Sequence, residues 1–229
     1  MVSLGTRSIA SKEEIVYCNI TGLKIDPARL AEFTDLLYSS ETIRTCKAMG
    51  IRDAMLVQVV DQPGLLRSVS QFDSQAQADQ LFASPFYADL GKGLKPFLME
   101  APTRMGFNVL IQRKFKERVP SMYINDTIIK VDPARVDAFI QVLWSAESID
   151  QMLKIGVFIE GLALHSLENP GTIHSVSFYP TPEDAKLVFT NPDYAALLGK
   201  LKPFLMAAPE RVGYSLVRTE EIPFTAAVA

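Results

Sequence analysis

Histidine, cysteine and tryptophan are scarce in this chain, whose 229 residues include two His, two Cys and one Trp. Cys18 and Cys46 both lie in the first quarter of the chain, which argues against a disulfide or metal framework and makes reduced thiols the expectation. No apolar run approaches the roughly 20 residues that a membrane helix needs, and the first residues lack the apolar core of a signal peptide. We therefore expect an intracellular, cytoplasmic protein without a membrane partner.

A surplus of charge of one sign is also missing. The chain has 23 Lys and Arg against 26 Asp and Glu, a net charge of −3 and a pI near 5.5. Its basic residues are scattered, so nucleic acid is not expected as a partner. With 48% hydrophobic and 21% charged residues the composition is that of a globular protein. The length suits two domains of roughly 100 residues.

Familiar catalytic signatures are absent as well. The sequence has no Ser-His-Asp order, no glycine-rich phosphate loop, no cysteine pair and no zinc-ligand spacing. These absences argue against the reaction classes that such motifs mark. Neither a metal nor a tightly held cofactor is expected.

The chain does contain an internal repeat of one domain. The segment 17–109 reappears as 123–216 at an offset of 106 or 107 residues, and the pentapeptide Lys-Pro-Phe-Leu-Met, for example, occurs once in each copy. A repeat of this length indicates a repeated structural unit. We therefore predict two domains, residues 13–113 and 120–219, joined by a short charged linker.

Each copy has the same predicted order of strands and helices. Asp26 and Asp132 stand directly before a proline, the pattern of an N-cap with proline in the first helical turn. A Pro-Gly pair between two apolar runs predicts a hairpin turn in each copy. The expected strands are 15–25, 51–60, 65–72 and 105–112 in the first copy and 122–131, 157–167, 172–179 and 212–217 in the second; the expected helices are 26–50, 74–82 and a short one around 90–98, mirrored by 132–156, 181–189 and one around 197–205. The order βαββαβ is that of a ferredoxin-like plait.

A single plait leaves one face of its four-stranded sheet uncovered, and burying that face is the physical reason for a second copy. The predicted fold class is α+β. We expect two ferredoxin-like plaits in one chain, packed sheet to sheet around a cavity. Such a chain is a monomer with an internal pseudo-dimer, or it forms a homodimer.

The paired plaits, the Pro-capped first helix and the strand-borne Asn19 and Asn125 resemble the dimeric α+β barrel superfamily, and within it the antibiotic-biosynthesis-monooxygenase-like group. The resemblance covers nearly the whole chain, in tandem-repeat form, and implies a small-molecule pocket enclosed by the plaits. Members include cofactor-free oxygenases acting on polycyclic phenols, haem-degrading enzymes, polyketide cyclases, decarboxylases, isomerases and non-catalytic proteins. The resemblance therefore indicates one fold but leaves several reactions open.

The first strand of each copy carries a tyrosine and an asparagine two residues apart, Tyr17 with Asn19 and Tyr123 with Asn125. Alternate residues of a strand point to one face. In relatives a first-strand asparagine lines the pocket, so the resemblance implies substrate binding at Asn19 and a catalytic role at Asn125. Such an amide can orient a carbonyl or phenol for attack by oxygen. The structural alternative is an amide that is hydrogen-bonded to neighbouring backbone. Tyr17 and Tyr123, on the same face, are further candidates for substrate binding.

Both histidines, His165 and His174, lie on the hairpin of the second copy and have no counterparts in the first. If the turn is centred on Asn169 and Pro170, the two histidines pair across the strands. Such a pair could act as general base and acid near neutral pH or contribute two metal ligands. A structural or surface role and a bulge that shifts the register are the alternatives. On this interpretation the second copy does the chemistry and the first supports it.

Further candidates for substrate binding come from the second copy. Ser177 and Tyr179 share one face of its third strand, and strand hydroxyls there suggest a polar patch in the cavity. Arg211 could clamp a carboxylate or phenolate or cap the preceding helix. Trp144, on the first helix, is a binding candidate whose alternative is a place in the core.

The leading hypothesis is a small-molecule enzyme of secondary or aromatic metabolism, a cofactor-independent monooxygenase, cyclase or isomerase acting on an apolar polycyclic or polyketide-like substrate. The alternative is a non-catalytic ligand-binding or stress-response pseudo-dimer. Haem binding or degradation is disfavoured, because the resemblance implies an iron-ligating histidine near the second helix and segments 74–98 and 181–205 contain none.

Overall fold

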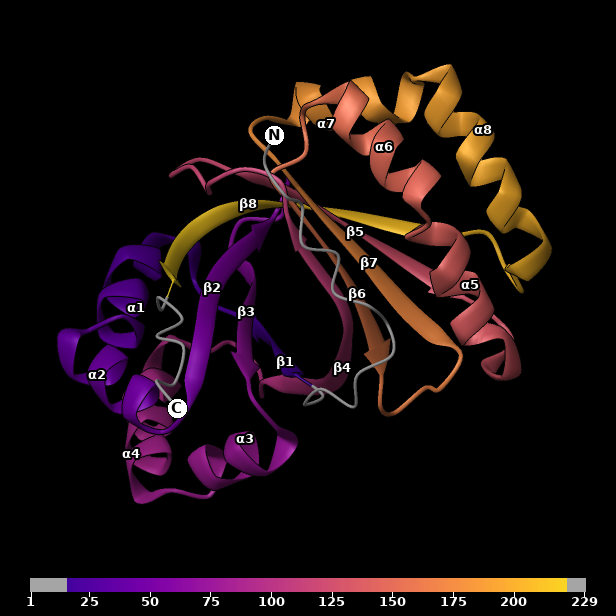
Figure 1. Ribbon diagram of the computed structural model, residues 1–229. Helices are drawn as coiled ribbons and strands as arrows, with labels where there is room; N and C mark the ends of the chain where they lie inside the picture. Colours follow the sequence, from indigo (N-terminus) through magenta and orange to yellow (C-terminus); the bar gives the residue numbers. More distant parts are fainter. Residues whose placement is uncertain (1–15, 222–229) are drawn as a thin grey trace, which may run out of the picture.

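The computed structural model of the protein describes residues 16–221 (Figure 1). The predicted starts of the first domain at residue 13 and of the first strand at residue 15 lie outside this range. The first half contains β1 (Tyr17–Lys24), η1 (Pro27–Arg29), α1 (Leu30–Leu37), α2 (Ser40–Ala48), β2 (Ile51–Val59), β3 (Leu65–Phe72), α3 (Gln75–Phe82), α4 (Pro85–Leu94), η2 (Lys95–Phe97) and β4 (Thr103–Lys114). The second half contains β5 (Tyr123–Lys130), η3 (Pro133–Arg135), α5 (Val136–Leu143), α6 (Ala146–Ile155), β6 (Glu160–Ser166), β7 (Thr172–Tyr179), α7 (Pro182–Thr190), α8 (Pro192–Leu201), η4 (Lys202–Phe204) and β8 (Glu210–Glu221).

The strands form one closed barrel in the order β1-β3-β2-β8-β5-β7-β6-β4. The last strand of each half joins the two sheets. β4 pairs with β1 of its own half and then with β6 of the other, and β8 pairs with β5 and then with β2. Both strands have 12 residues and exceed the predicted ranges at both ends. The residues added at their N-terminal ends pair within the same half, and those added at their C-terminal ends pair with the opposite half. The predicted α+β class with two ferredoxin-like units in one chain is confirmed.

The helices cover the barrel from two outer sides, α1–α4 beside the first half and α5–α8 beside the second (Figure 1). The interior of the barrel, where we expected a cavity, is instead occupied by an apolar cluster from both halves. Its buried members are Cys18, Ile20, Met55, Val57, Val59, Phe107, Met122, Ile124, Ile159, Leu162, Leu164, Phe178 and Tyr214. The space between the sheets is therefore core.

The first predicted helix of each half is divided in two. Ser39 adopts an extended backbone conformation with φ −60° and ψ 151°, and its hydroxyl accepts a hydrogen bond from the backbone N–H of Thr42 at 3.2 Å. Ser39 is therefore the N-cap of a separate helix, α2. Ser145 does the same for α6. Each break leaves an aromatic residue, Tyr38 or Trp144, at the junction of the two helices.

Between helices and sheet, each half has two apolar clusters. In the first half, the α1 cluster comprises Leu23, Ile25, Phe33, Tyr38, Leu56 and Leu66, and the α3 cluster comprises Tyr17, Ile51, Phe72, Ala78 and Leu81. In the second half, the α5 cluster comprises Ile129, Val131, Val136, Phe139, Ile140, Leu143, Ala163, Ile173 and Leu201, and the α7 cluster comprises Met152, Phe158, Tyr179, Ala185, Val188, Tyr194 and Leu197. The halves therefore share one layout.

A buried ionic cluster ties the linker to both halves. Arg118 donates from Nη1 and Nη2 to Asp53 of β2, at 2.9 and 2.7 Å, and from Nε to Glu160 of β6, at 2.9 Å. Gln112 donates to the other oxygen of Glu160 at 2.7 Å. Burial by itself would lower the pKa of Arg118, but its hydrogen bonds with Asp53 raise that pKa above the ordinary value. The guanidinium therefore stays charged.

Among the helices that the structure describes, none is long and apolar enough to cross a membrane.

Candidate functional site

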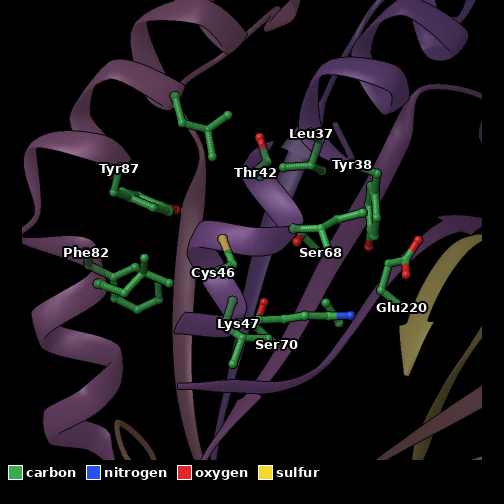
Figure 2. Close-up of a pocket in the computed structure, with 15 residues that line it drawn as sticks. Leu37, Tyr38, Thr42, Cys46, Lys47, Ser68, Ser70, Phe82, Tyr87 and Glu220 are labelled. Atoms are coloured by element: carbon green, nitrogen blue, oxygen red, sulfur yellow. The ribbon is translucent and has the colours of Figure 1, made fainter. Parts of the chain in front are cut away.

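A cavity with a volume of about 80 Å³, partly open to solvent, lies in the first half between the helices and the sheet (Figure 2). It separates the α1 cluster from the α3 cluster, and residues of both line it. Its helical walls come from α1, α2, α3 and α4, and its floor comes from β2 and β3. Glu220 of β8 also lines it, because β8 crosses from the second half to pair with β2.

The walls of the cavity are mostly apolar and aromatic. Phe82 and Tyr87 face it from the α3–α4 side, opposite Tyr38 (Figure 2). The rings of Phe82 and Tyr87 contact each other edge to face, with centroids 5.1 Å apart. Pockets for small molecules are typically lined in this way, with a few polar groups that orient the ligand.

Hydroxyl groups and two charged side chains provide the polar part of the lining. Ser68 and Ser70 lie on the floor, since alternate residues of β3 share a face. Lys47 is exposed and Glu220 is partly exposed, so a positive and a negative charge stand near the solvent side. Burial raises the pKa of the Tyr38 hydroxyl, which keeps it a neutral donor at physiological pH.

Arg104 contacts the two aromatic side chains, Phe82 and Tyr87, that line the cavity. Its guanidinium lies 3.9 Å from the centroid of the Phe82 ring, and its Nη2 donates to the Tyr87 hydroxyl at 3.0 Å. A guanidinium over an aromatic face is attracted to the ring electrons. Arg104 therefore fixes the position of two rings that line the cavity.

The thiol of Cys46 also lines the cavity, and burial raises its pKa to about 11. We expect its alkylation by iodoacetamide to rise about tenfold per pH unit from pH 7 towards 11, because only the thiolate reacts. Mass spectrometry of the modified protein measures the rate, with the urea-unfolded chain as control. A rate that levels off below pH 9 would contradict the burial of this thiol.

The corresponding space in the second half is filled by Trp144, the counterpart of Tyr38. A Cβ added to Gly161, the counterpart of Ala54, would lie 2.6 Å from Cη2 of Trp144. The indole packs against both the α5 and the α7 cluster. In the first half, among the residues described, no side chain packs against both of the equivalent clusters.

Leu198 fills the second half further, since it also packs against both clusters. Its counterpart in the first half is Gly91, where an added Cβ would meet nothing within 4 Å. Two enlarged side chains therefore close in one half the space that remains open in the other.

The predicted pairing of the two histidines is wrong. His165 pairs with Ile173, and His174 pairs with Leu164, so the register differs by one residue from a turn centred on Asn169 and Pro170. A slip of one residue turns side chains to opposite faces of a sheet. The imidazoles therefore do not face each other and cannot act as a cross-strand acid and base.

Each histidine has a separate environment. The Nε2 atom of His165 lies 2.5 Å from the carbonyl oxygen of Pro170 in the hairpin turn. His174 is buried, its Nδ1 lies 2.8 Å from Oδ2 of Asp126, and its ring meets Phe107 edge to face at 4.9 Å. Neither histidine lines the cavity of the first half.

The first-strand tyrosine and asparagine of each half share one face, as predicted from their spacing, and that face is turned towards the helices. Asn19 and Asn125 are buried, and each amide donates to a threonine two residues on, at 3.0 and 2.9 Å. Oδ1 of Asn19 has no hydrogen-bond partner. Asn19 stands directly beside Ser70 in the sheet, so this oxygen belongs to the strand face that forms the cavity floor. Tyr17 lies in the α3 cluster.

The remaining predicted residues lie in the closed half. Tyr123 and Tyr179 pack in or against the α7 cluster, and burial raises the pKa of both hydroxyls. Ser177 stands beside Asn125 and Gly161 in the sheet. Arg211 stacks over Phe189 at 4.1 Å, as Arg104 does over Phe82. These contacts brace helices against the sheet.

Among the described residues, no group of three or more His, Cys, Asp or Glu side chains is arranged to hold a metal ion.

Several lining residues were not singled out from the sequence, among them Cys46, Lys47, Phe82, Tyr87 and Glu220. The signal that could have located them is the difference in size between paired residues of the two copies. Tyr38 and Gly91 of the first copy are smaller than their counterparts Trp144 and Leu198, and this difference in side-chain size indicates which half is open.

No family profile and no curated protein matches this chain. Solved structures do: a proposed monooxygenase from Lactobacillus acidophilus NCFM shares 12% identity with a TM-score of 0.71, covering 91% of this chain and 97% of its own. An anthrone oxidase-like protein shares 13% identity with a TM-score of 0.63, covering 95% and 98%. A ferredoxin-fold protein from Listeria monocytogenes, described as related to antibiotic biosynthesis monooxygenases, shares 10% with a TM-score of 0.51, covering 90% and 96%.

The closed eight-stranded barrel and these similarities define the class: the chain has the dimeric α+β barrel fold, with both plaits in one polypeptide. Within that class it is similar in fold to a proposed monooxygenase and to a protein described as related to antibiotic biosynthesis monooxygenases.

Proposed function

We propose that the protein is a cofactor-independent monooxygenase that binds a flat aromatic ketone or phenol in the cavity of the first half. The cavity itself carries the proposal: aromatic and aliphatic walls surround hydroxyl groups on a sheet floor, and the space is open at one side. The names of the similar structures, monooxygenase and anthrone oxidase-like protein, support the same reaction class.

The chemistry expected of such a site can be written for anthrone, a tricyclic ketone with an acidic methylene group. Loss of one methylene proton gives a carbanion, whose charge is shared with the ketone oxygen. Reaction with O2 forms a carbon–oxygen bond, and loss of water from the hydroperoxide breaks the O–O bond. Anthrone and O2 thus give anthraquinone and water, with O2 as the only oxidant.

The residues of the cavity suit the individual steps. The hydroxyls of Ser68 and Ser70 are placed to donate to the developing oxyanion, which is the stabilisation that such a reaction needs. The ammonium group of Lys47 adds positive charge near the solvent side, and the carboxylate of Glu220 is placed to accept the proton. The aromatic rings of Phe82 and Tyr87 would hold the substrate in one plane.

An oxygen electrode tests the proposal directly. With anthrone, the wild-type protein is expected to consume one O2 per anthraquinone formed, faster than anthrone oxidises in buffer. Replacing Ser68 and Ser70 together by alanine should lower kcat/KM about 10-fold, since each lost hydrogen bond contributes about 0.5–1.5 kcal/mol.

The second half offers a matched control. Ser175→Ala with Ser177→Ala makes the same change at the equivalent strand positions, away from the cavity, and should leave kcat/KM unchanged. Oxygen consumption at the buffer rate would refute the oxygenase. If anthraquinone still binds in that case, the protein is a ligand-binding pseudo-dimer.

A further inference from the structure

We propose that the segment 222–229, which follows β8, docks over the open side of the first-half cavity and covers it. The described part of the chain ends at residue 221, beside this cavity. Four features support the docking: the place where β8 ends, the apolar rim of the cavity, the path of the equivalent segment in the other half, and the composition of the segment. The proposal concerns access to the cavity and holds whatever reaction takes place there.

β8 ends next to the cavity. Glu220 lines the cavity, and Glu221 pairs with Asp53 of β2, a strand that forms part of the cavity floor. Ile222 is therefore the second residue after a lining residue. An extended chain spans about 3.3–3.6 Å per residue, so Phe224 can reach roughly 14 Å from the backbone of Glu220. The segment is thus placed to meet the cavity lining without any change in the barrel.

The rim of the cavity has apolar side chains that are only half-buried. In the second half, Trp144 and Leu198 pack over the equivalent positions. The first-half residues Leu37, Tyr87 and Leu90 line the cavity and are half-buried, whereas their counterparts Leu143, Tyr194 and Leu197 are buried. Covering such apolar surface is favourable. The first half therefore offers an apolar docking surface that the second half does not.

The linker shows where a chain that leaves such a strand can lie. Phe115 follows β4 as Ile222 follows β8, at the repeat offset of 107 residues. The backbone N–H of Phe115 donates to the carbonyl of Ile159 at 2.8 Å, and its ring packs against the α7 cluster, with its centroid 6.1 Å from that of Phe158. The counterpart of Phe158 is Ile51, which lines the cavity. Ile222 in the equivalent place lies at the edge of the cavity.

Beyond this first residue the two segments differ in charge and in hydrogen bonding. Linker residues 116–118 are Lys, Glu and Arg, whereas 222–229 contains no charged residue. The backbone N–H of Lys116 also donates to the carbonyl of Ile159, at 3.0 Å, but its counterpart Pro223 has no N–H to donate. The segment therefore leaves the path of the linker directly after its first residue, with apolar side chains that the cavity rim can bury.

Phe224 is the residue on which the docking depends most. The side chain of its linker counterpart, Glu117, is 88% exposed, and a phenylalanine gains free energy by leaving water. The rim beside Glu220 provides apolar surface for its ring. Docked there, the ring shields the cavity, including the thiol of Cys46, from reagents in solution.

Alkylation of Cys46 by iodoacetamide at a fixed pH measures access to the cavity without any ligand. Phe224→Asp should make it about 10-fold faster than in the wild type, because a charged side chain does not dock on an apolar rim. Phe224→Leu should stay close to the wild-type rate, as should Met206→Asp, which places the same charge at a site of the second half that is 69% exposed. Cys18, which is 0% exposed inside the barrel, reports unfolding and should stay unmodified in every variant.

Photo-crosslinking identifies what covers the cavity. Benzoylphenylalanine in place of Phe224 should crosslink to α2, α3 or α4 of the same molecule, as mapped by mass spectrometry. Crosslinks to a second copy of the chain or to the second half would overturn the proposal, as would an unchanged alkylation rate in a folded Phe224→Asp variant. If that variant also exposes Cys18, the crosslinking result decides alone. Because neither measurement uses a ligand or turnover, the docking of the segment and the proposed oxygenase fail independently of each other.

Discussion

Replacing Arg118 by alanine is expected to lower the free energy of unfolding by about 3–5 kcal/mol, the cost of leaving buried charges without their partner. The side chain of Arg118 is 5% exposed, and it is hydrogen-bonded to Asp53 and Glu160, which are 10% and 2% exposed. Removing the guanidinium leaves two buried carboxylates without their cation.

The effect is expected to be large because the cluster joins parts distant in sequence. Asp53 belongs to β2 of the first half, Glu160 to β6 of the second, and Arg118 to the linker. The same guanidinium therefore holds the linker and both sheets. Urea unfolding followed by circular dichroism measures the change in free energy.

Two further variants serve as the control and the rescue for this prediction. Lys92→Ala removes an exposed ion pair with Asp89 at 2.7 Å and should cost about 1 kcal/mol or less. Adding Asp53→Asn and Glu160→Gln to Arg118→Ala removes the unpaired charges and should restore part of the stability. A loss for Arg118→Ala as small as that for Lys92→Ala would show that the cluster is not buried in solution.

Transferring the closed arrangement of the second half to the first is expected to weaken ligand binding strongly. In Tyr38→Trp with Ala54→Gly, the new indole should lie on the sheet as Trp144 does over Gly161. The dissociation constant for 1,8-dihydroxyanthraquinone should rise about 10- to 100-fold, since burying one large apolar group contributes about 1.5–3 kcal/mol.

Ala54→Gly alone is the matched control, because it changes the floor without adding a ring and should leave binding close to that of the wild type. Titration calorimetry measures both variants. A folded double variant that binds as tightly as the wild type would place the ligand outside the first-half cavity.

The sequence predicts that the second half does the chemistry and the first supports it, because only the second half contains histidines, whereas the cavity lies in the first half. His165 and His174 stand out in the sequence because they are chemically reactive and have no counterparts. The structure places them on opposite faces of the sheet and apart from the cavity. The difference that opens one half and closes the other is side-chain volume, at Tyr38 against Trp144 and at Gly91 against Leu198.

The sequence by itself determined the repeat, the βαββαβ order and the start of the first helical segment in each half, because these depend on neighbouring residues. It missed the breaks that start α2 and α6, and it placed the starts of α4 and α8 several residues too late. Asp26 and Asp132 cap their helices with the predicted side-chain hydrogen bonds, at 3.0 and 2.9 Å. The pairing of the two plaits followed from the uncovered sheet face that each copy must bury. Local patterns of polarity, proline and glycine are enough for such conclusions.

Only the tertiary structure decided the register of the histidine hairpin, the crossing of β4 and β8 and the location of the cavity. The register depends on one residue in a turn, and a slip of one residue reverses every side chain. The cavity depends on whether residues as distant in sequence as Trp144 and Leu198 fill the space between the same two clusters. Packing of that kind is settled by volumes that meet in space, which a sequence pattern does not record.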